Sequence, residues 1–189
     1  MLTYEQRFRM WFVRPYEVLQ SRPQGEDDID WNGAYVALAI GCMLCERYFR
    51  AKTGTTEVLT REAAKLDENV GYNRRFHKAA ASHFGLSVAK FERFWTCYRN
   101  GVQHQGMPRK VFRRVHGQTI VYKSWISADV DFTHVPTEET KENEVRIKLN
   151  PWAFTSHIIE LFLNDTNALE IGFHHAFAQI HTLHEHHEN

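Results

Sequence analysis

The sequence lacks the features that would assign it to several large classes of protein. It contains no GxSxG, no GxxxxGKS or GxxxxGKT and no GxGxxG, so serine-hydrolase chemistry and the common phosphate-binding loops find no support. Its 23 basic and 23 acidic residues give a formal net charge of zero, so an anionic partner must be held by a local cluster of cations. With 43% hydrophobic and 24% charged residues, the composition excludes a disordered or fibrous chain.

Long apolar segments are also missing. The longest nearly uncharged run, Ile29–Cys45, contains Asp30 and Asn32 and is shorter than the roughly 20 apolar residues that span a bilayer. The first residues of the chain carry charges where a secretory signal would be apolar. We therefore expect no association with a membrane, and a cytoplasmic location.

Cysteine is scarce: Cys42, Cys45 and Cys97 are the three in the sequence. The odd count, and the apolar segment around two of them, favour free buried thiols in a reducing compartment. The Cys42–Cys45 spacing is that of half a zinc site, but no second CxxC follows. We expect neither a structural metal nor a cofactor.

Apolar residues recur mostly at helical spacing, which predicts a mainly α chain. Expected helices run from Thr3 to Gln20 with an interruption near Pro15, from Asp30 to Gly54, from Thr60 to Gly85 with a break near Gly71, from Ser87 into the stretch discussed next, from Asn150 to Leu163, and onward from Thr166.

Between these helices, β-branched and aromatic residues in partial alternation predict strands over Thr119–Ser127 and Glu144–Leu149, with a loop over Pro136–Asn143. We expect one domain over residues 1–189. In it, residues 111–149 form a β-rich insertion with a small hairpin or meander near 118–149, and residues 181–189 form a His-rich tail.

One stretch places several chemically capable side chains at the end of a predicted aromatic helix: Tyr98-Arg99-Asn100-Gly101-Val102-Gln103-His104. On an uninterrupted helix Arg99 and His104 would lie about 140° apart, so we expect Gly101 to end the helix and bring His104 back toward Arg99. The arginine fork suits phosphate oxygens, and a histidine, with an ordinary pKa near 6.5, exchanges protons at cellular pH. The spacing alone recurs by chance, as at Arg109 and His116, so Asn100 and Gly101 carry the interpretation.

Arg99, Asn100 and His104 together resemble the hallmark of the HEPN superfamily (higher eukaryotes and prokaryotes nucleotide-binding domains). That hallmark is an arginine, often followed by asparagine, with a histidine a few residues on. The order of elements over residues 31–107 and 150–183 is also similar to that family's helical bundle. In this sequence the long helix of that order would carry Glu46. The resemblance implies a mainly α, HEPN-like bundle, and the β-like segment 111–149 departs from the family pattern.

The resemblance further implies a metal-independent endoribonuclease that acts as a toxin or in antiviral defence. RNA would be cleaved by attack of its own 2′-hydroxyl, with His104 as general base or acid and Arg99 stabilising the charge on the phosphoryl oxygens. Asn100 would orient a partner or cap the helix, and Glu46 would orient Arg99 or His104 or pair with a neighbouring arginine. A homodimer would bring two motifs into one site, and an antitoxin is a further expected partner.

Two basic clusters, residues 74–78 and 109–114, could hold an RNA backbone. The expected phosphate contacts are the first cations of each: Arg74, Arg75, Arg109 and Lys110. The alternative is that both clusters are solvated faces of ordinary structure.

Two other functions remain open. A non-catalytic module that binds RNA or protein is favoured if Arg99 is held in a structural ion pair and His104 is buried. A metal-binding role is suggested by histidines near the end of the sequence: His174, His175, His181, His184, His186 and His187.

Overall fold

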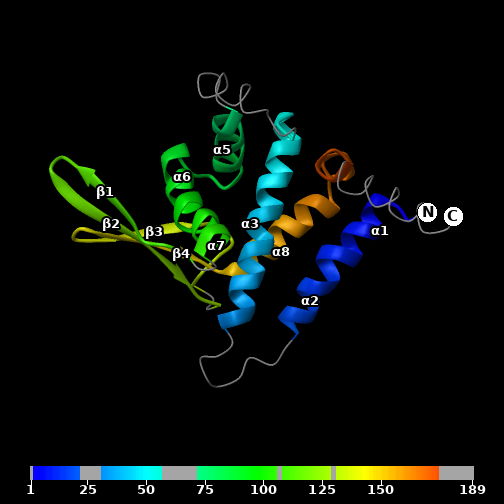
Figure 1. Cartoon of the computed structure of the whole chain (residues 1–189), viewed down its shortest axis with the longest axis horizontal. Helices are drawn as coiled ribbons and strands as arrows, with labels where there is room; N and C mark the ends of the chain where they lie inside the picture. Colours follow the sequence, from blue (N-terminus) through cyan, green and yellow to red (C-terminus); the bar gives the residue numbers. More distant parts are fainter. Residues whose placement is uncertain (1, 22–30, 57–71, 106–107, 129–130, 175–189) are drawn as a thin grey trace.

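Helices form one end of the molecule and a four-stranded sheet forms the other (Figure 1). The computed structural model describes residues 2–21, 31–56, 72–105, 108–128 and 131–174, without the side chains of residues 31, 32, 72 and 103–105. The predicted cap at Asp30 and the predicted helix from Thr60 to its break near Gly71 lie outside these residues.

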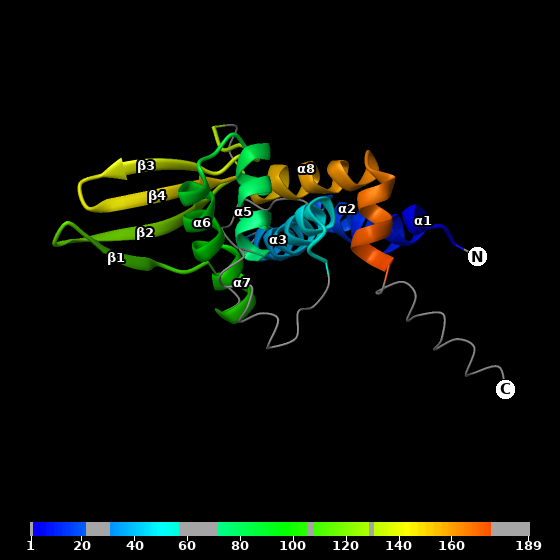
Figure 2. The ribbon, with the colours of Figure 1, turned by 90° about the horizontal axis from the view of Figure 1, so that it is seen from above.

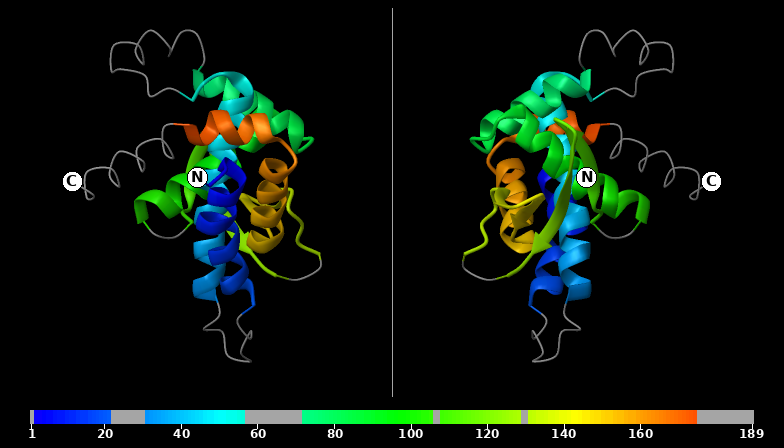
Figure 3. Two further views of the ribbon diagram at one scale, coloured as in Figure 1. Left: turned by 90° about the vertical axis from the view of Figure 1, so that its right-hand side faces the viewer. Right: turned by 90° about the vertical axis from the view of Figure 1, so that its left-hand side faces the viewer.

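The first predicted helix is present, but its winding changes. It consists of α1 (Tyr4–Phe8), a π-helical turn (Arg9–Val13) and α2 (Arg14–Gln20). Pro15 lacks an N–H and its ring would clash with the carbonyl four residues earlier, and the π turn ends at Val13, two residues before it. The predicted interruption near Pro15 is therefore a change of winding rather than a helix end. Figure 3 shows α2 alongside the next helix, α3.

The central helix α3 (Trp31–Thr53) packs against α8 (Pro151–Leu163). Both predicted boundary signals are confirmed. Gly54 follows α3 with a φ of 65°, and the side chain of Asn150 accepts the N–H groups of Trp152 and Ala153 at the start of α8.

Gly41 permits the close approach of α3 and α8. A Cβ at this position would lie 2.4 Å from Oγ1 of Thr155 and 2.9 Å from the Phe154 ring. The Thr155 hydroxyl is buried and donates to the carbonyl of Ala37 at 2.7 Å. The two helices thus touch through backbone as well as side chains.

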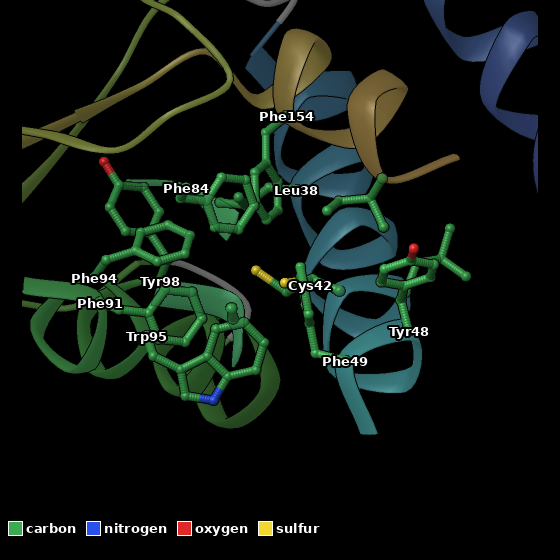
Figure 4. Packing of buried hydrophobic residues seen from close by; sticks show 14 of the residues in the cluster. Leu38, Cys42, Tyr48, Phe49, Phe84, Phe91, Phe94, Trp95, Tyr98 and Phe154 are labelled. Carbon is green, nitrogen blue, oxygen red and sulfur yellow. The ribbon is translucent and has the colours of Figure 1, made fainter. Parts of the chain in front are cut away.

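Helices α5 (Tyr72–His83) and α6 (Val88–Cys97) contribute aromatic side chains to the core (Figure 4). Ser87 caps α6 as predicted, and Gly85 ends the preceding turn with a φ of 65°. Phe91 stacks on Trp95 with ring centroids 5.5 Å apart, and Phe94 meets Phe154 of α8 at 5.6 Å. The contact between Phe94 and Phe154 joins α6 to α8.

The predicted last helix is seen over residues 166–174. Asp165 caps it by accepting the N–H of Ala168 at 2.9 Å, and Phe173 packs on Phe162 and on Phe8 of α1. The helix closes the core beside the N-terminal helices.

The strands are β1 (Val111–Val115), β2 (Gln118–Ile126), β3 (Thr137–Lys141) and β4 (Glu144–Leu149), in the order β1-β2-β4-β3. Figure 2 shows the two hairpins side by side, extending beyond α6. The central pair, β2 and β4, is parallel, while each outer strand is antiparallel to its neighbour. His116 and Gly117 both have positive φ, as a two-residue hairpin turn requires.

The predicted fold class, a HEPN-like helical bundle with a small hairpin or meander near residues 118–149, is therefore wrong. A hairpin or meander pairs only sequence neighbours, whereas here β2 pairs in parallel with β4 to form a mixed sheet. The expected loop over Pro136–Asn143 contains β3, and the basic cluster after Lys110 contains β1. Both are outer strands with little apolar alternation, so the pattern that identifies half-buried strands is weak in them.

The sheet also shares the core of the helices. The buried side chains on its helix-facing side are Tyr122, Val145, Ile147 and Leu149. Arg93 of α6 forms a two-bond ion pair with Glu138 of β3 on the same side, at 2.7 and 2.8 Å. One face of the sheet is thus packed against α6.

Candidate functional site

Arg99 is the first residue of helix α7 (Arg99–Gln105), directly after a break in the helix at Tyr98. Tyr98 is fully buried and its hydroxyl lies between the two central strands. The hydroxyl donates to the carbonyl of Ile147 at 2.5 Å and accepts the N–H of Trp125 at 3.0 Å. The sheet therefore fixes where α7 begins and where Arg99 is placed.

Gly101 does not end the helix, so this prediction is wrong. It is buried within α7, and the backbone remains helical to Gln105. Glycine in a helix interior lowers helix stability by only about 1 kcal/mol relative to alanine. The helix is interrupted at Tyr98 instead. Positions 99 and 104 are consequently about 140° apart around one helix. The side chain of His104 lies outside the described part of the chain.

The guanidinium of Arg99 is bound to Glu46 of α3. Its Nε and Nη2 donate to the same carboxylate oxygen at 3.1 and 2.8 Å, and Nη1 donates to the side chain of Asn100 at 3.2 Å. The structure thus brings together three of the predicted site residues.

A second arginine shares the Glu46 carboxylate. Arg50, one turn further along α3, donates from Nε and Nη2 to the other oxygen of Glu46 at 2.9 and 2.8 Å, and also to Asn73 of α5 at 2.8 Å. Glu46 therefore contacts Arg99 as well as a neighbouring arginine. We call Glu46, Arg50 and Arg99 the arginine pair cluster.

The cluster is part-buried and carries an excess of positive charge. Its three side chains are 17 to 23% exposed, and two guanidinium groups face one carboxylate. Partial burial weakens screening by water, so this charge acts more strongly than a solvated pair would. An anionic group such as a phosphodiester would be attracted to this place.

His77 of α5 lies close enough to the arginine pair cluster for the charges of Arg50 and Glu46 to act on its pKa, and it was not singled out from the sequence. Its Nδ1 is 3.5 Å from the carboxylate of Glu92 in α6. Burial lowers the pKa of His77, Glu92 raises it, and the charges of Arg50 and Glu46 act on it with opposite signs. The spacing of Glu46 and Arg50 on one helix predicts that pair, but no local signal predicts that α5 brings Asn73 and His77 to it.

The four predicted phosphate contacts differ in their settings. Arg74 and Arg75 on α5 and Lys110 before β1 are exposed. Arg109, in contrast, is bound to the end of α6: its Nε donates to the carbonyl of Thr96 at 3.2 Å, and its backbone N–H donates to the carbonyl of Cys97 at 2.9 Å. Arg109 thus completes the C-terminal end of α6.

The three cysteines are free and buried, as predicted. Burial raises the pKa of Cys97 to about 11 and also raises the pKa values of Cys42 and Cys45. Among the residues that the structure describes, no group of three or more histidine, cysteine or acidic side chains is arranged to hold a metal ion.

Of the histidines near the end of the sequence, His174 is described, and its Nδ1 is 3.2 Å from the hydroxyl of Tyr4. The others lie outside the described residues: His175, His181, His184, His186 and His187.

No protein-family model matches the chain, and no curated protein or solved structure is significantly similar to it. Within the described ranges, no helix combines the length and the apolar character needed to cross a membrane.

Proposed function

We propose that the chain is a metal-independent endoribonuclease of the HEPN type, with Arg99 at its site. The observation that supports this best is the arginine pair cluster, in which two guanidinium groups converge on one carboxylate beside the helix that carries His104. The cluster offers positive charge in a part-buried setting, which the transition state of phosphodiester cleavage needs.

In the proposed reaction the 2′-hydroxyl of RNA attacks the adjacent phosphorus and the 5′-oxygen leaves. The products are a 2′,3′-cyclic phosphate and a 5′-hydroxyl. Arg99 would turn one or more of its N–H groups from Glu46 to the phosphoryl oxygens, and Arg50 would keep the Glu46 charge neutralised. His104 would exchange the proton, because histidine titrates near cellular pH. DNA has no 2′-hydroxyl and would resist cleavage.

We further propose that two copies complete the site. On a continuous α7 the positions of Arg99 and His104 point about 140° apart, which disfavours their meeting at one phosphate within a single chain. A symmetric dimer would let the histidine of one subunit act with the arginine of its partner. A toxin or defence role, an antitoxin and a cytoplasmic location belong to the same proposal.

The proposal is tested by incubating the protein with single-stranded RNA in excess chelator and examining the product ends. We expect 2′,3′-cyclic phosphate ends from the parent and none from His104→Ala. Mixing Arg99→Ala with His104→Ala should restore part of the activity, because a mixed dimer retains one intact site. Cleavage that requires an added divalent metal would contradict the mechanism, and absence of restoration would contradict the shared site.

A non-catalytic RNA-binding module is the second proposal. It is favoured by one observation: Nε and Nη2 of Arg99 are engaged by Glu46 and Nη1 by Asn100, as in a structural ion pair. Under this alternative Glu46→Gln lowers the stability of the protein, and no preparation cleaves RNA. Under the nuclease proposal the parent cleaves, and Glu46→Gln changes the rate as well as the stability.

A further inference from the structure

The sheet has one face that α6 does not cover. Strand residues that lie opposite each other share a face, so the register assigns Phe112, Val121, Lys123 and Trp125 to the side away from the buried Tyr122 and Ile147. On β4 the same side carries Glu144, Arg146 and Lys148, and on β3 it carries Thr137, Glu139 and Lys141. We call this side the open face of the sheet.

Two large aromatic side chains are exposed on the open face. Phe112 is 66% exposed and Trp125 is 40% exposed. Trp125 lies near the end of a central strand, and burial of its ring would stabilise the fold, so its exposure calls for a partner. Phe132 and Trp125 form a T-shaped ring contact with centroids 5.8 Å apart.

Cations surround the tryptophan. The guanidinium of Arg146 and the Nζ of Lys148 each lie 5.0 Å from the centre of the Trp125 ring. Counting along the strands, the open face carries five cations and two carboxylates, which leaves a formal excess of three positive charges on a chain whose net charge is zero. The cations are Arg114, Lys123, Lys141, Arg146 and Lys148.

The spacing of these groups matches an extended strand with a repeating charge. Phe112 of β1 lies opposite Val121 of β2, and Val121 is four residues before Trp125. The positions of Phe112 and Trp125 are therefore roughly 13 Å apart along the strand direction. Lys123 of β2 and Arg146 of β4 lie opposite each other, between these two positions along the strands. Aromatic, cationic and again aromatic groups therefore follow one another along the face.

We propose that the open face binds single-stranded RNA, with bases stacked on Trp125 and Phe112 and the backbone phosphates held by Lys123, Arg146 and Lys148. Stacking on aromatic rings and a cationic surface that follows the backbone are the two features by which proteins hold unpaired nucleic acid. The inference rests on the proposed function, because it assigns to this face the RNA that the site near Arg99 would cleave.

The ion pairs on the face do not oppose this assignment. Lys123 and Arg146 share Glu144, and Lys148 contacts Glu139, at side chains that are 25 to 47% exposed. Exposed pairs of this kind contribute little to stability, so a phosphate can replace a carboxylate at small cost. The carboxylates are outnumbered, and the excess charge remains for the ligand.

The open face is connected to the candidate site through the backbone. The N–H of Trp125 and the carbonyl of Ile147 both bind the hydroxyl of Tyr98, and Arg99 is the next residue. An RNA strand stacked on Trp125 would therefore be held by one of the two residues that fix the start of α7.

The test uses a fluorescently labelled single-stranded oligonucleotide of mixed sequence with 2′-O-methyl groups, which has no nucleophile and so reports binding without cleavage. Anisotropy titrations should show that Trp125→Ala and Phe112→Ala each weaken binding by about 5- to 100-fold. Lys123→Gln should lower the slope of log affinity against log salt by about one. Trp11→Ala is the matched control, since Trp11 is 47% exposed and belongs to the π turn between α1 and α2, helices that lie at the other end of the molecule from the sheet (Figure 1). This variant should bind as tightly as the parent.

Several results would overturn the inference. These are failure of the parent to bind the oligonucleotide, equal affinity in Trp125→Ala and Trp11→Ala, and tighter binding of the corresponding duplex than of the single strand. If the face instead binds a protein, the parent should fail to bind the oligonucleotide. The proposed nuclease is tested separately, because Arg99→Ala should slow cleavage of unmodified RNA by at least about 10²–10³-fold while binding the 2′-O-methyl strand within about 3-fold of the parent.

Discussion

Replacing Tyr98 by phenylalanine removes one buried hydroxyl that joins the helices to the sheet. The change deletes the bond to the carbonyl of Ile147 at 2.5 Å and the bond from the N–H of Trp125 at 3.0 Å. Each bond contributes about 1 kcal/mol net, and a buried group left without a partner costs about 1–3 kcal/mol. We therefore expect a loss of about 2–4 kcal/mol in the free energy of unfolding.

The measurement is the midpoint and slope of urea unfolding, with Tyr48→Phe as the matched control. The Tyr48 hydroxyl lies 3.4 Å from Asp165, which keeps a 2.8 Å bond from Lys52, so its loss should cost under about 1 kcal/mol. If Tyr98→Phe and Tyr48→Phe cost the same, or if Tyr98→Phe is within about 0.5 kcal/mol of the parent, the hydroxyl does not anchor the sheet.

Three further predictions concern packing, pH and thiol reactivity. Gly41→Ala should lower the free energy of unfolding by about 1–3 kcal/mol, because its Cβ would lie 2.4 Å from a hydroxyl oxygen. Gly172→Ala, whose Cβ would have its nearest atom at 3.4 Å, should be neutral or stabilising by up to about 1 kcal/mol. Equal effects of the two changes in urea unfolding would refute the packing argument. Burial and the nearby charge of His134 lower the pKa values of His83 and His157, so the folded state binds fewer protons than the unfolded state. The free energy of unfolding should therefore keep its full value above about pH 6.5 and fall as the pH decreases below it. His157→Gln should reduce this fall, as measured by urea midpoints between about pH 7.5 and 5. Burial raises the pKa of Cys97 to about 11, so its thiol should not react with a disulfide reagent at pH 8 until urea unfolds the protein, and rapid reaction of the native state would contradict its burial.

Local signals in the sequence predicted the helix boundaries well. Ser87 and Asn150 have side chains that accept the first free N–H groups of a helix, and Gly54 and Gly85 accept a positive φ, so each boundary depends on a few adjacent residues. Such signals do not depend on the rest of the fold, which is why they can be interpreted without it.

The sheet could not be predicted in the same way. Strand β3 has the sequence Thr137-Glu138-Glu139-Thr140-Lys141 and is entirely polar, because its outward side faces solvent and Glu138 on its inward side pairs with Arg93 of α6. The parallel pairing of β2 with β4 joins segments separated by β3 and its flanking turns, and only the completed fold makes that pairing favourable.

The candidate site was predicted in part. Arg99, Asn100 and Glu46 do come together, but the role given to Gly101 was wrong because the sheet holds Tyr98 and moves the helix break there. Arg50 reaches Glu46 from one turn away, whereas Asn73 arrives from another helix and leaves no trace in the local sequence.

The central claim is that Arg99 stabilises the transition state of RNA cleavage, and the most direct measurement is the single-turnover rate on an unmodified RNA in chelator. Arg99→Ala should be slower than the parent by at least about 10²–10³-fold, as expected for loss of one donor to a developing oxyanion. Arg93→Ala removes an ion-paired arginine of similar burial, 19% exposed against 23%, and should cleave at the rate of the parent. If Arg99→Ala cleaves as fast as Arg93→Ala, or if the parent leaves no 2′,3′-cyclic phosphate ends, the account is contradicted.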